Sequence, residues 1–230
     1  MAVDLDRACH TINQAGMQII AGCIIGFDNE TSGADGRLID FAVRNQIPEM
    51  FVSLLQAAPG TALWQRLEKE GRLLLQSYEQ AGNQTYLMNF LPTRPIKEIV
   101  EEFTSLYAAL YERDFYLKRV LHHLLRMKPR LTPRPFQMPY LYEIKALLAV
   151  LIRHGFAYSS RWSFWRCLFT LLRYNPQRLT EFLTYCSRCE HYTEFAQTIW
   201  NELRHQLASL DLGTAKPPVL CDPPVRGFWK

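Results

Sequence analysis

Residues 15–30, AGMQIIAGCIIGFDNE, form a nearly continuous apolar run that closes in a turn-like FDNE. A strand covered on both faces has such an unbroken run, and in parallel sheets helices cover both faces. Gly22 and Gly26 lie inside it, and glycine weakens a strand unless something approaches the backbone closely. The pattern predicts a ligand-facing strand of an α/β barrel over 17–26. An ordinary buried strand that ends in a glycine turn is the alternative.

Outward from this stretch, hydrophobic periodicity predicts alternating helices and strands. In order, these are a helix over 5–15 capped by Asp4 or Asp6, the strand 17–26, a helix over 34–46, a strand over 50–56 and a helix over 61–70 capped by Thr61. This order is the repeating unit of a parallel α/β sheet. Two strands do not close a barrel, so the unit must pack against strands outside this sequence or against something else.

The remainder of the sequence predicts helices. Residues 72–93 read as irregular, with an extended piece at 85–91, and helices are expected near 140–154, 161–173, 176–189 and 191–209. The predicted fold class is therefore α/β and helix-rich. Its predicted parts are a partial TIM-like (β/α) barrel segment, 1–93; one long helix that starts at Pro95, 94–127; a proline-rich linker, 128–139; an all-α domain, 140–209; and a mobile tail, 210–230.

Composition limits where the protein works. The chain has 230 residues, of which 48% are hydrophobic, enough to bury a sizeable core. Its most apolar region, 146–172, is interrupted by arginines, so no membrane span is expected. Residues 1–6 show neither a basic nor an apolar signal-peptide region. The six cysteines follow no disulfide framework, which fits a reducing, cytoplasmic compartment.

Charge is strongly segregated along the chain. Residues 117–178 carry twelve Lys/Arg against one Asp/Glu, whereas residues 1–116 carry nine against fifteen. Three interpretations stay open for the basic segment: a solvated helical face, a patch for an anionic membrane surface, and a nucleic-acid surface. The run RWSFWR, 161–166, mixes tryptophan and arginine as interfacial helices do, which places the peripheral-membrane interpretation second. Nucleic acid comes third because no recognised binding motif is present.

Residues 22–30, GCIIGFDNE, resemble the glycine–isoleucine–glycine–glutamate motif on the fifth barrel strand of radical S-adenosylmethionine (SAM) enzymes. The approach over 14–19 and the later LQAAPGTAL, 55–63, are similar to the entry into that strand and to the sixth strand with its Pro-Gly-Thr turn. The chain most resembles the cobalamin-binding class, in its carboxyl-terminal part. The similarity covers 5–115 and extends more loosely into the helical remainder, which resembles that class's helical extension.

This resemblance implies a set of SAM-binding positions: Gly22, Ile24, Gly26, Glu30, Leu55, Gln56 and Ala57. Ile24 would lie against the adenine ring, because aromatic bases bind apolar faces, and the two glycines would leave room for it. Glu30 would organise the turn or the following helix. The backbone of 55–57 would meet the edge of the adenine from the second strand.

One departure from that family is large. Radical SAM enzymes hold a four-iron four-sulfur cluster on a Cys-x-x-x-Cys-x-x-Cys loop, and no three cysteines here have that spacing: Cys9, Cys23, Cys167, Cys186, Cys189 and Cys221. The intact family member is expected to use SAM, the cluster and cobalamin, whereas this chain alone is expected to hold none of them. It would be inactive alone, although methyltransferase-like in origin, and would need an amino-terminal complement. Whether it is an enzyme stays open.

The other candidate sites have simpler explanations. Cys186, Cys189 and His191 lack the further ligand that zinc needs, so they are interpreted as helix-face residues. His122 and His123 are neighbours on a helix and face different directions. No metal site and no catalytic residue are predicted. The competing hypothesis for function is a basic helical binding module for an anionic membrane surface or nucleic acid.

Overall fold

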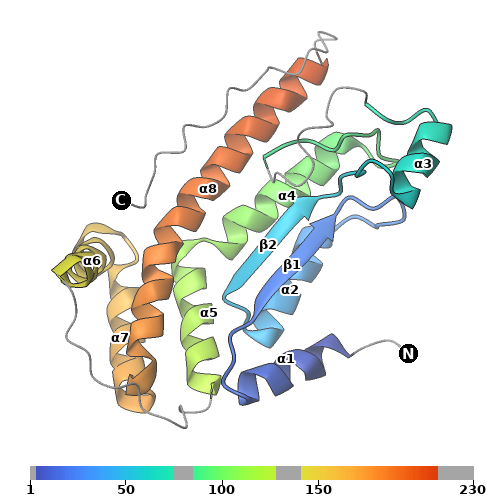
Figure 1. The fold of residues 1–230 in the computed structure, drawn as a ribbon. Helices are drawn as coiled ribbons and strands as arrows, with labels where there is room; N and C mark the ends of the chain where they lie inside the picture. Colours follow the sequence, from blue (N-terminus) through green and yellow to red (C-terminus); the bar gives the residue numbers. More distant parts are fainter. Residues whose placement is uncertain (1–3, 75–84, 128–140, 212–230) are drawn as a thin grey trace.

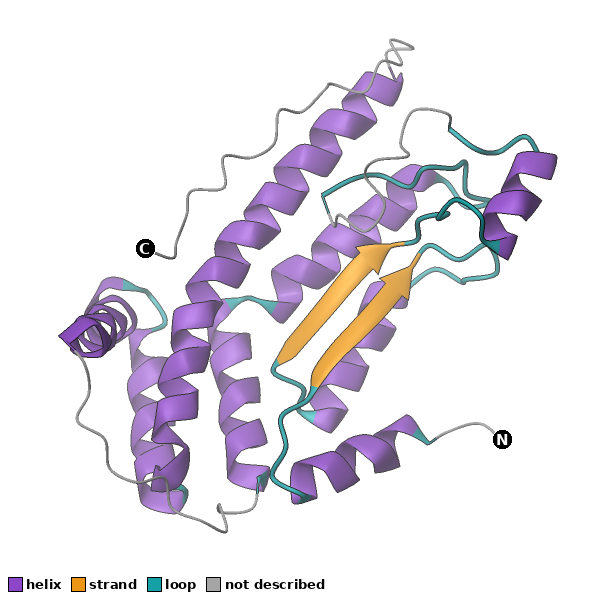
Figure 2. Ribbon diagram, viewed as in Figure 1, coloured by secondary structure: helices purple, strands orange, loops and turns teal. Residues whose placement is uncertain are grey.

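The computed structural model describes residues 4–74, 85–127 and 141–211, and shows helices packed around a two-stranded parallel sheet (Figures 1 and 2). The predicted helix–strand–helix–strand–helix order and the helix-rich α/β class are confirmed. The elements are α1 (Leu5–Gln14), β1 (Ile20–Ile25), α2 (Ala34–Asn45), β2 (Glu49–Leu54), α3 (Ala62–Lys69), α4 (Ile96–Leu110), α5 (Arg113–Arg126), α6 (Leu141–Ile152), α7 (Arg161–Tyr174) and α8 (Leu179–Asp211).

Helix starts follow the predicted capping residues. The Asp4 carboxylate accepts a hydrogen bond from the Arg7 N–H at 3.1 Å, and the Thr61 hydroxyl accepts one from the Trp64 N–H at 3.2 Å. Each bond satisfies a main-chain donor that the first turn of a helix leaves without a partner. Local sequence therefore fixes where α1 and α3 begin.

Within residues 4–74, 85–127 and 141–211, helices cover one face of the sheet, whereas the sequence predicted cover on both faces. Strand β1 pairs with β2 in parallel, with Gly22 opposite Phe51 and Ile24 opposite Ser53. In Figure 1 both strands lie in front of α2 and α4, and no described helix crosses their near side. Side-chain exposure alternates along β1 accordingly. Ile20, Gly22 and Ile24 are exposed, with Ile20 at 56%, whereas the residues between them are partly buried and Ile25 is fully buried. The apolar run does contain a strand, but the described part of the chain covers only one of the two faces of that strand.

Residues 94–127 form two helices, where the sequence predicted one long helix. Helix α4 ends at Leu110, and α5 starts at Arg113. The Glu112 carboxylate accepts hydrogen bonds from the Asp114 and Phe115 N–H groups, at 3.1 and 2.7 Å. This N-cap starts a new helix and lets α5 turn away from α4, although the apolar periodicity continues across the break.

At the carboxyl-terminal end, one helix forms where the sequence predicted two. The predicted helices 176–189 and 191–209 are one continuous α8, preceded by a single 3-10 turn. Helix α6 ends in a π-helical turn, Arg153–Ala157. The predicted extended piece at 85–91 contributes one isolated bridge, between Leu73 and Phe90. The predicted linker, 128–139, and nearly all of the predicted tail lie outside the described residues.

The core joins the sheet to the helices through aromatic rings. Helix α8 packs on α4 and α5. The ring of Tyr111, directly after α4, stacks on the Tyr192 ring of α8 with centroids 4.5 Å apart, and Phe51 of β2 meets Tyr192 edge-on. Among the helices described, none is long and apolar enough to span a bilayer.

Candidate functional site

The uncovered side of the sheet is the candidate site. Its residues, called the open sheet face here, are Ile20, Gly22, Ile24, Phe51 and Ser53. Ile24 is 48% exposed and Phe51 42% exposed, and a Cβ added to Gly22 would meet no atom within 4 Å. Soluble domains seldom leave a contiguous apolar surface without a use for it. The face is therefore open, apolar and free of obstruction at its centre.

The opposite side of β1 explains why these residues point outward. Ala21 and Cys23 are partly buried and Ile25 is fully buried, all within the core that includes α2 and α4. Side chains alternate along a strand, so burying this set presents the other set to the open side. Burial also raises the pKa of the Cys23 thiol, which keeps it protonated and unreactive at neutral pH.

The turn after β1 is built by Gly26 and Glu30. Gly26 has φ +97°, a conformation that side chains disfavour, and an added Cβ would lie 2.9 Å from Met88 Cε. Its N–H donates a 2.6 Å hydrogen bond to the Glu30 carboxylate. Glu30 thus connects the two ends of the turn that follows β1, and its role in a SAM site stays a prediction. Gly26, in contrast to Gly22, faces the protein interior.

Residues 55–57 lie at the carboxyl end of β2, beside that turn. The Leu55 N–H donates to the Ile25 carbonyl at 2.9 Å, and the Gln56 side chain donates to the Leu87 carbonyl at 2.9 Å. Asn89 holds Ala57 from both sides, because its amide accepts from the Ala57 N–H and donates to its carbonyl, each at 2.8 Å. Sequence reasoning missed Asn89, since a lone asparagine in an irregular segment carries no signal.

Ion pairs fix the loop between β1 and α2. Asp28 binds the Arg72 guanidinium and the Arg66 guanidinium, each at 2.6 Å, and the Arg72 hydrogen bonds lower the Asp28 pKa. Farther along, Glu102 accepts from Arg94 at 2.7 Å and from the Gly33 N–H at 2.8 Å. Of the seven predicted site residues, Gly22 and Ile24 lie on the open sheet face, and the other five lie at the carboxyl ends of the two strands. Ligands of parallel α/β sheets bind at that end.

The two outer edges of the sheet differ. The Tyr111 hydroxyl donates to the Met50 carbonyl at 2.7 Å and accepts from its N–H, and the Tyr107 hydroxyl does the same with Val52. These bonds satisfy the outward main-chain groups of β2, and the adjoining α4 covers that edge. The outward groups of β1 belong to Ile20, Gly22 and Ile24, and they form no hydrogen bond to a described residue.

The described side chains do not assemble a metal or cluster site. Within 4–74, 85–127 and 141–211 no three His, Cys, Asp or Glu side chains group as ligands. Cys186 and Cys189 are fully buried in α8, where burial raises both pKa values, while His191 is exposed. His122 is exposed and His123 buried, on different helix faces as predicted. These residues do not fit an iron–sulfur cluster, which needs several closely placed cysteine thiolates.

The chain is similar to a family of known proteins and to two relatives that are named as methyl-transferring enzymes. Residues 61–205 match the family described as Domain of unknown function (DUF4070). The chain is 39% identical to "Uncharacterized methyltransferase sll1242" of Synechocystis over 85% of its own length and 36% of that protein. It is 32% identical to "Hopanoid C-2 methylase" of Rhodopseudomonas palustris, over 52% of its own length and 21% of that protein. It thus spans well under half of each relative. No solved structure matches it.

Proposed function

The chain belongs to the DUF4070 family, and from that premise we propose that it is the carboxyl-terminal part of a radical SAM-type methyltransferase. The relatives' names support methyl transfer as the chemistry of the intact protein. The resemblance of residues 22–30 supports SAM as the nucleoside that the sheet meets. In this proposal the chain contributes one wall of a cofactor site.

The open sheet face is the observation that carries the proposal. An adenine ring needs an apolar surface to lie on and unobstructed space above it. Ile24 offers the surface, and Gly22, two residues earlier on the same face, lacks the side chain that would obstruct it. The backbone of 55–57, held by Asn89, offers hydrogen-bonding groups at the carboxyl end of the same sheet.

The residues of this chain would bind and orient the cofactor. When bound, SAM supplies methyl donation or, beside a reduced cluster, radical chemistry. Ile24 would exclude water from one side of the adenine, and Glu30 would hold the Gly26 turn in place through their 2.6 Å hydrogen bond. The five residues of the open sheet face include no acidic or basic side chain, so this face would bind the cofactor without exchanging a proton with it.

The site needs a complement that brings the cluster. The described cysteines do not group as ligands, so the cluster would come from outside this chain, and with it the strands that continue the sheet. The free outer edge of β1 is the place where such strands would pair, because tyrosine hydroxyls already occupy the edge of β2. The proposal therefore predicts no SAM cleavage by the chain alone.

Complementation tests the proposal. The chain would be co-expressed with the part of the Synechocystis relative that lies outside the alignment, and release of 5′-deoxyadenosine from SAM would be measured after cluster reconstitution. We expect activity from the pair and none from either part. Gly22→Val should reduce it at least about tenfold by placing a side chain where the adenine lies. Gly36→Val, at an open position on α2, is the matched control. Cleavage by the chain alone, or full activity of Gly22→Val, would contradict the proposal.

A further inference from the structure

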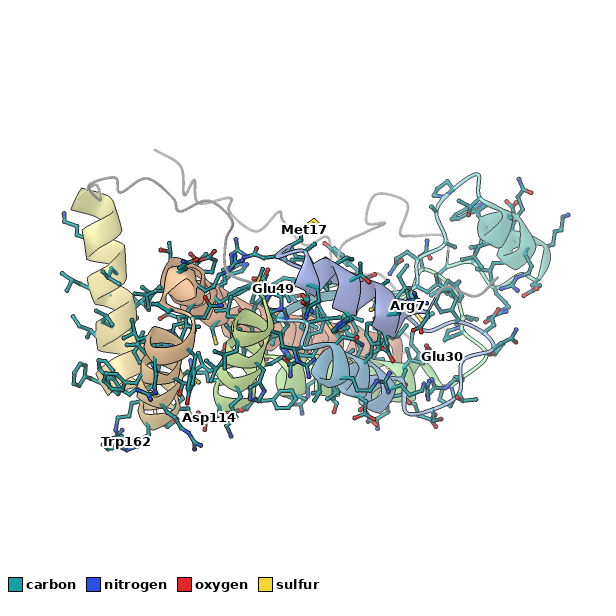
Figure 3. All side chains as sticks on the ribbon, turned by 90° about the horizontal axis from the view of Figure 1, so that it is seen from below. Arg7, Met17, Glu30, Glu49, Asp114 and Trp162 are labelled. Atoms are coloured by element: carbon teal, nitrogen blue, oxygen red, sulfur yellow. The ribbon has the colours of Figure 1, made fainter. Side chains whose placement is uncertain are left out.

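A second unusual surface lies far from the sheet, on α6, the π-helical turn and α7. Its apolar side chains are exposed, among them Trp162 at 75%, Phe156 at 68% and Phe169 at 62%. Figure 3 shows Trp162 at the opposite end of the molecule from Glu30. We propose that this surface docks the protein on a bilayer of anionic lipid. The proposal is independent of the function proposed above.

The surface, called the arginine–aromatic patch, is continuous. It comprises Leu148, Ile152, Phe156, Trp162, Phe169 and Leu172, with Arg161, Arg166 and Arg173. Residues 148, 152 and 156 follow one another at four-residue spacing, and so lie on one side of α6 and its π-helical turn. The Phe156 ring then meets the Trp165 ring with centroids 5.8 Å apart, and Trp165 stacks on Phe169 at 5.8 Å. These ring contacts connect the apolar stripe of α6 with that of α7.

The geometry of the patch is fixed by Gly155. The Trp165 indole N–H donates to the Gly155 carbonyl at 2.9 Å, and a Cβ at Gly155 would come within 2.9 Å of the indole ring. The absence of a side chain therefore lets α7 approach the π-helical turn closely. The two helices present their exposed side chains as one rigid unit, so little conformational entropy is lost when they bind a surface.

The charge of the patch selects the partner. The sequence has no aspartate or glutamate between Glu143 and Glu181. Arg161, Arg166 and Arg173 are exposed and form no ion pair with any described residue, whereas Arg153 binds Glu190. A second copy of the same patch would meet it with like charge. The surface therefore favours an anionic partner.

The apolar residues favour a bilayer over nucleic acid. Leu148, Ile152 and Leu172 are aliphatic and contribute nothing to base stacking, but they enter the boundary between headgroups and acyl chains. Tryptophan prefers this interface because its ring is apolar and its N–H is polar. Arginines beside it reach anionic headgroups while their stems remain in apolar surroundings. Aliphatic, aromatic and cationic side chains thus each have a place at a lipid surface.

Vesicle flotation tests the proposal. The full chain would be mixed with vesicles of phosphatidylcholine alone or with one third phosphatidylglycerol. We expect it to float with the anionic vesicles and to remain largely unbound with neutral ones. Trp162→Ala with Phe169→Ala should weaken binding at least about tenfold by removing inserted apolar area. Replacing Arg161, Arg166 and Arg173 by Gln should weaken anionic binding about fivefold per arginine.

Trp200 and Arg204 provide the matched control. They form an exposed tryptophan–arginine pair on α8, with the guanidinium 4.9 Å from the ring centroid, outside the patch. Trp200→Ala with Arg204→Gln should float as the unchanged protein does, and circular dichroism would establish that all variants fold. Equal binding to neutral and anionic vesicles, no binding to either, or tighter binding to a single-stranded oligonucleotide would each overturn the proposal.

Discussion

At the scale of the residue, Gly22 and Gly26 of the β1 motif are glycines for different structural reasons. Gly26 adopts φ +97° and packs on Met88, whereas Gly22 faces open space. We expect Gly26→Ala to lower the free energy of unfolding by about 1–3 kcal/mol. Gly22→Ala should leave it within about 1 kcal/mol of the original or raise it, because alanine restricts the unfolded chain. Urea unfolding measures both, and equal losses for the two variants would contradict this assignment.

Buried histidine makes stability depend on pH. Burial, and after it the positive charge of Arg178, lowers the pKa of His123 to about 4. The unfolded chain takes up this proton near pH 6.5, so stability falls as pH drops from about 6.5 to about 4, by about 2 kcal/mol at pH 5.

The neighbouring histidine gives the control for this prediction. His123→Phe should flatten the pH dependence of urea unfolding between pH 7 and 5. A remaining slope is expected from His154, whose pKa burial also lowers. His122→Phe, at an exposed position on the same helix, should keep the full slope. An unchanged slope in His123→Phe would show that this imidazole is not kept neutral by burial.

At the scale of the element, Tyr107 of α4 and Tyr111, the residue directly after α4, satisfy the outer edge of β2. Their hydroxyls pair with both main-chain groups of Met50 and of Val52, and burial raises the pKa of Tyr107 to about 12, so it stays a donor. Tyr107→Phe and Tyr111→Phe each leave a buried N–H and carbonyl without these bonds. We expect each to cost about 1–3 kcal/mol in urea unfolding. Tyr174→Phe, at an exposed site, should cost nothing measurable.

Elements were predictable where the signal is local. Asp4 and Thr61 begin helices as their types and positions predict, and the apolar run over 17–26 does contain β1. The apolar periodicity continues across Glu112 and so predicted one long helix over 94–127. That prediction was wrong, because the Glu112 side chain caps a second helix there. Whether helices cover both faces of a strand depends on how distant segments pack, which a local pattern does not show. One face of β1 was therefore predicted to be buried and is open.

At the scale of the whole molecule, the site residues taken from the family resemblance stay a prediction, and the structure shows only where they lie. The positions drawn from the family resemblance do gather at one end and one face of the sheet. The Asn89 amide donates to the Ala57 carbonyl, 32 positions away, and the Tyr107 hydroxyl donates to the Val52 carbonyl of the same sheet, 55 positions away. No periodic pattern encodes such pairings. The same holds for the stack of Tyr111 on Tyr192, which ties α8 to the sheet's supporting helix.

Exchange of the main-chain amides of β1 tests most directly the central claim, that β1 is the open side of a larger sheet. In the chain alone, the amides of Ile20, Gly22 and Ile24 should exchange rapidly, whereas those of Met50 and Val52 stay protected by the tyrosine hydroxyls. Adding the part of the Synechocystis relative outside the alignment should slow the three β1 amides at least about tenfold. Protection of these amides in the chain alone, or no slowing in the mixture, would contradict the account.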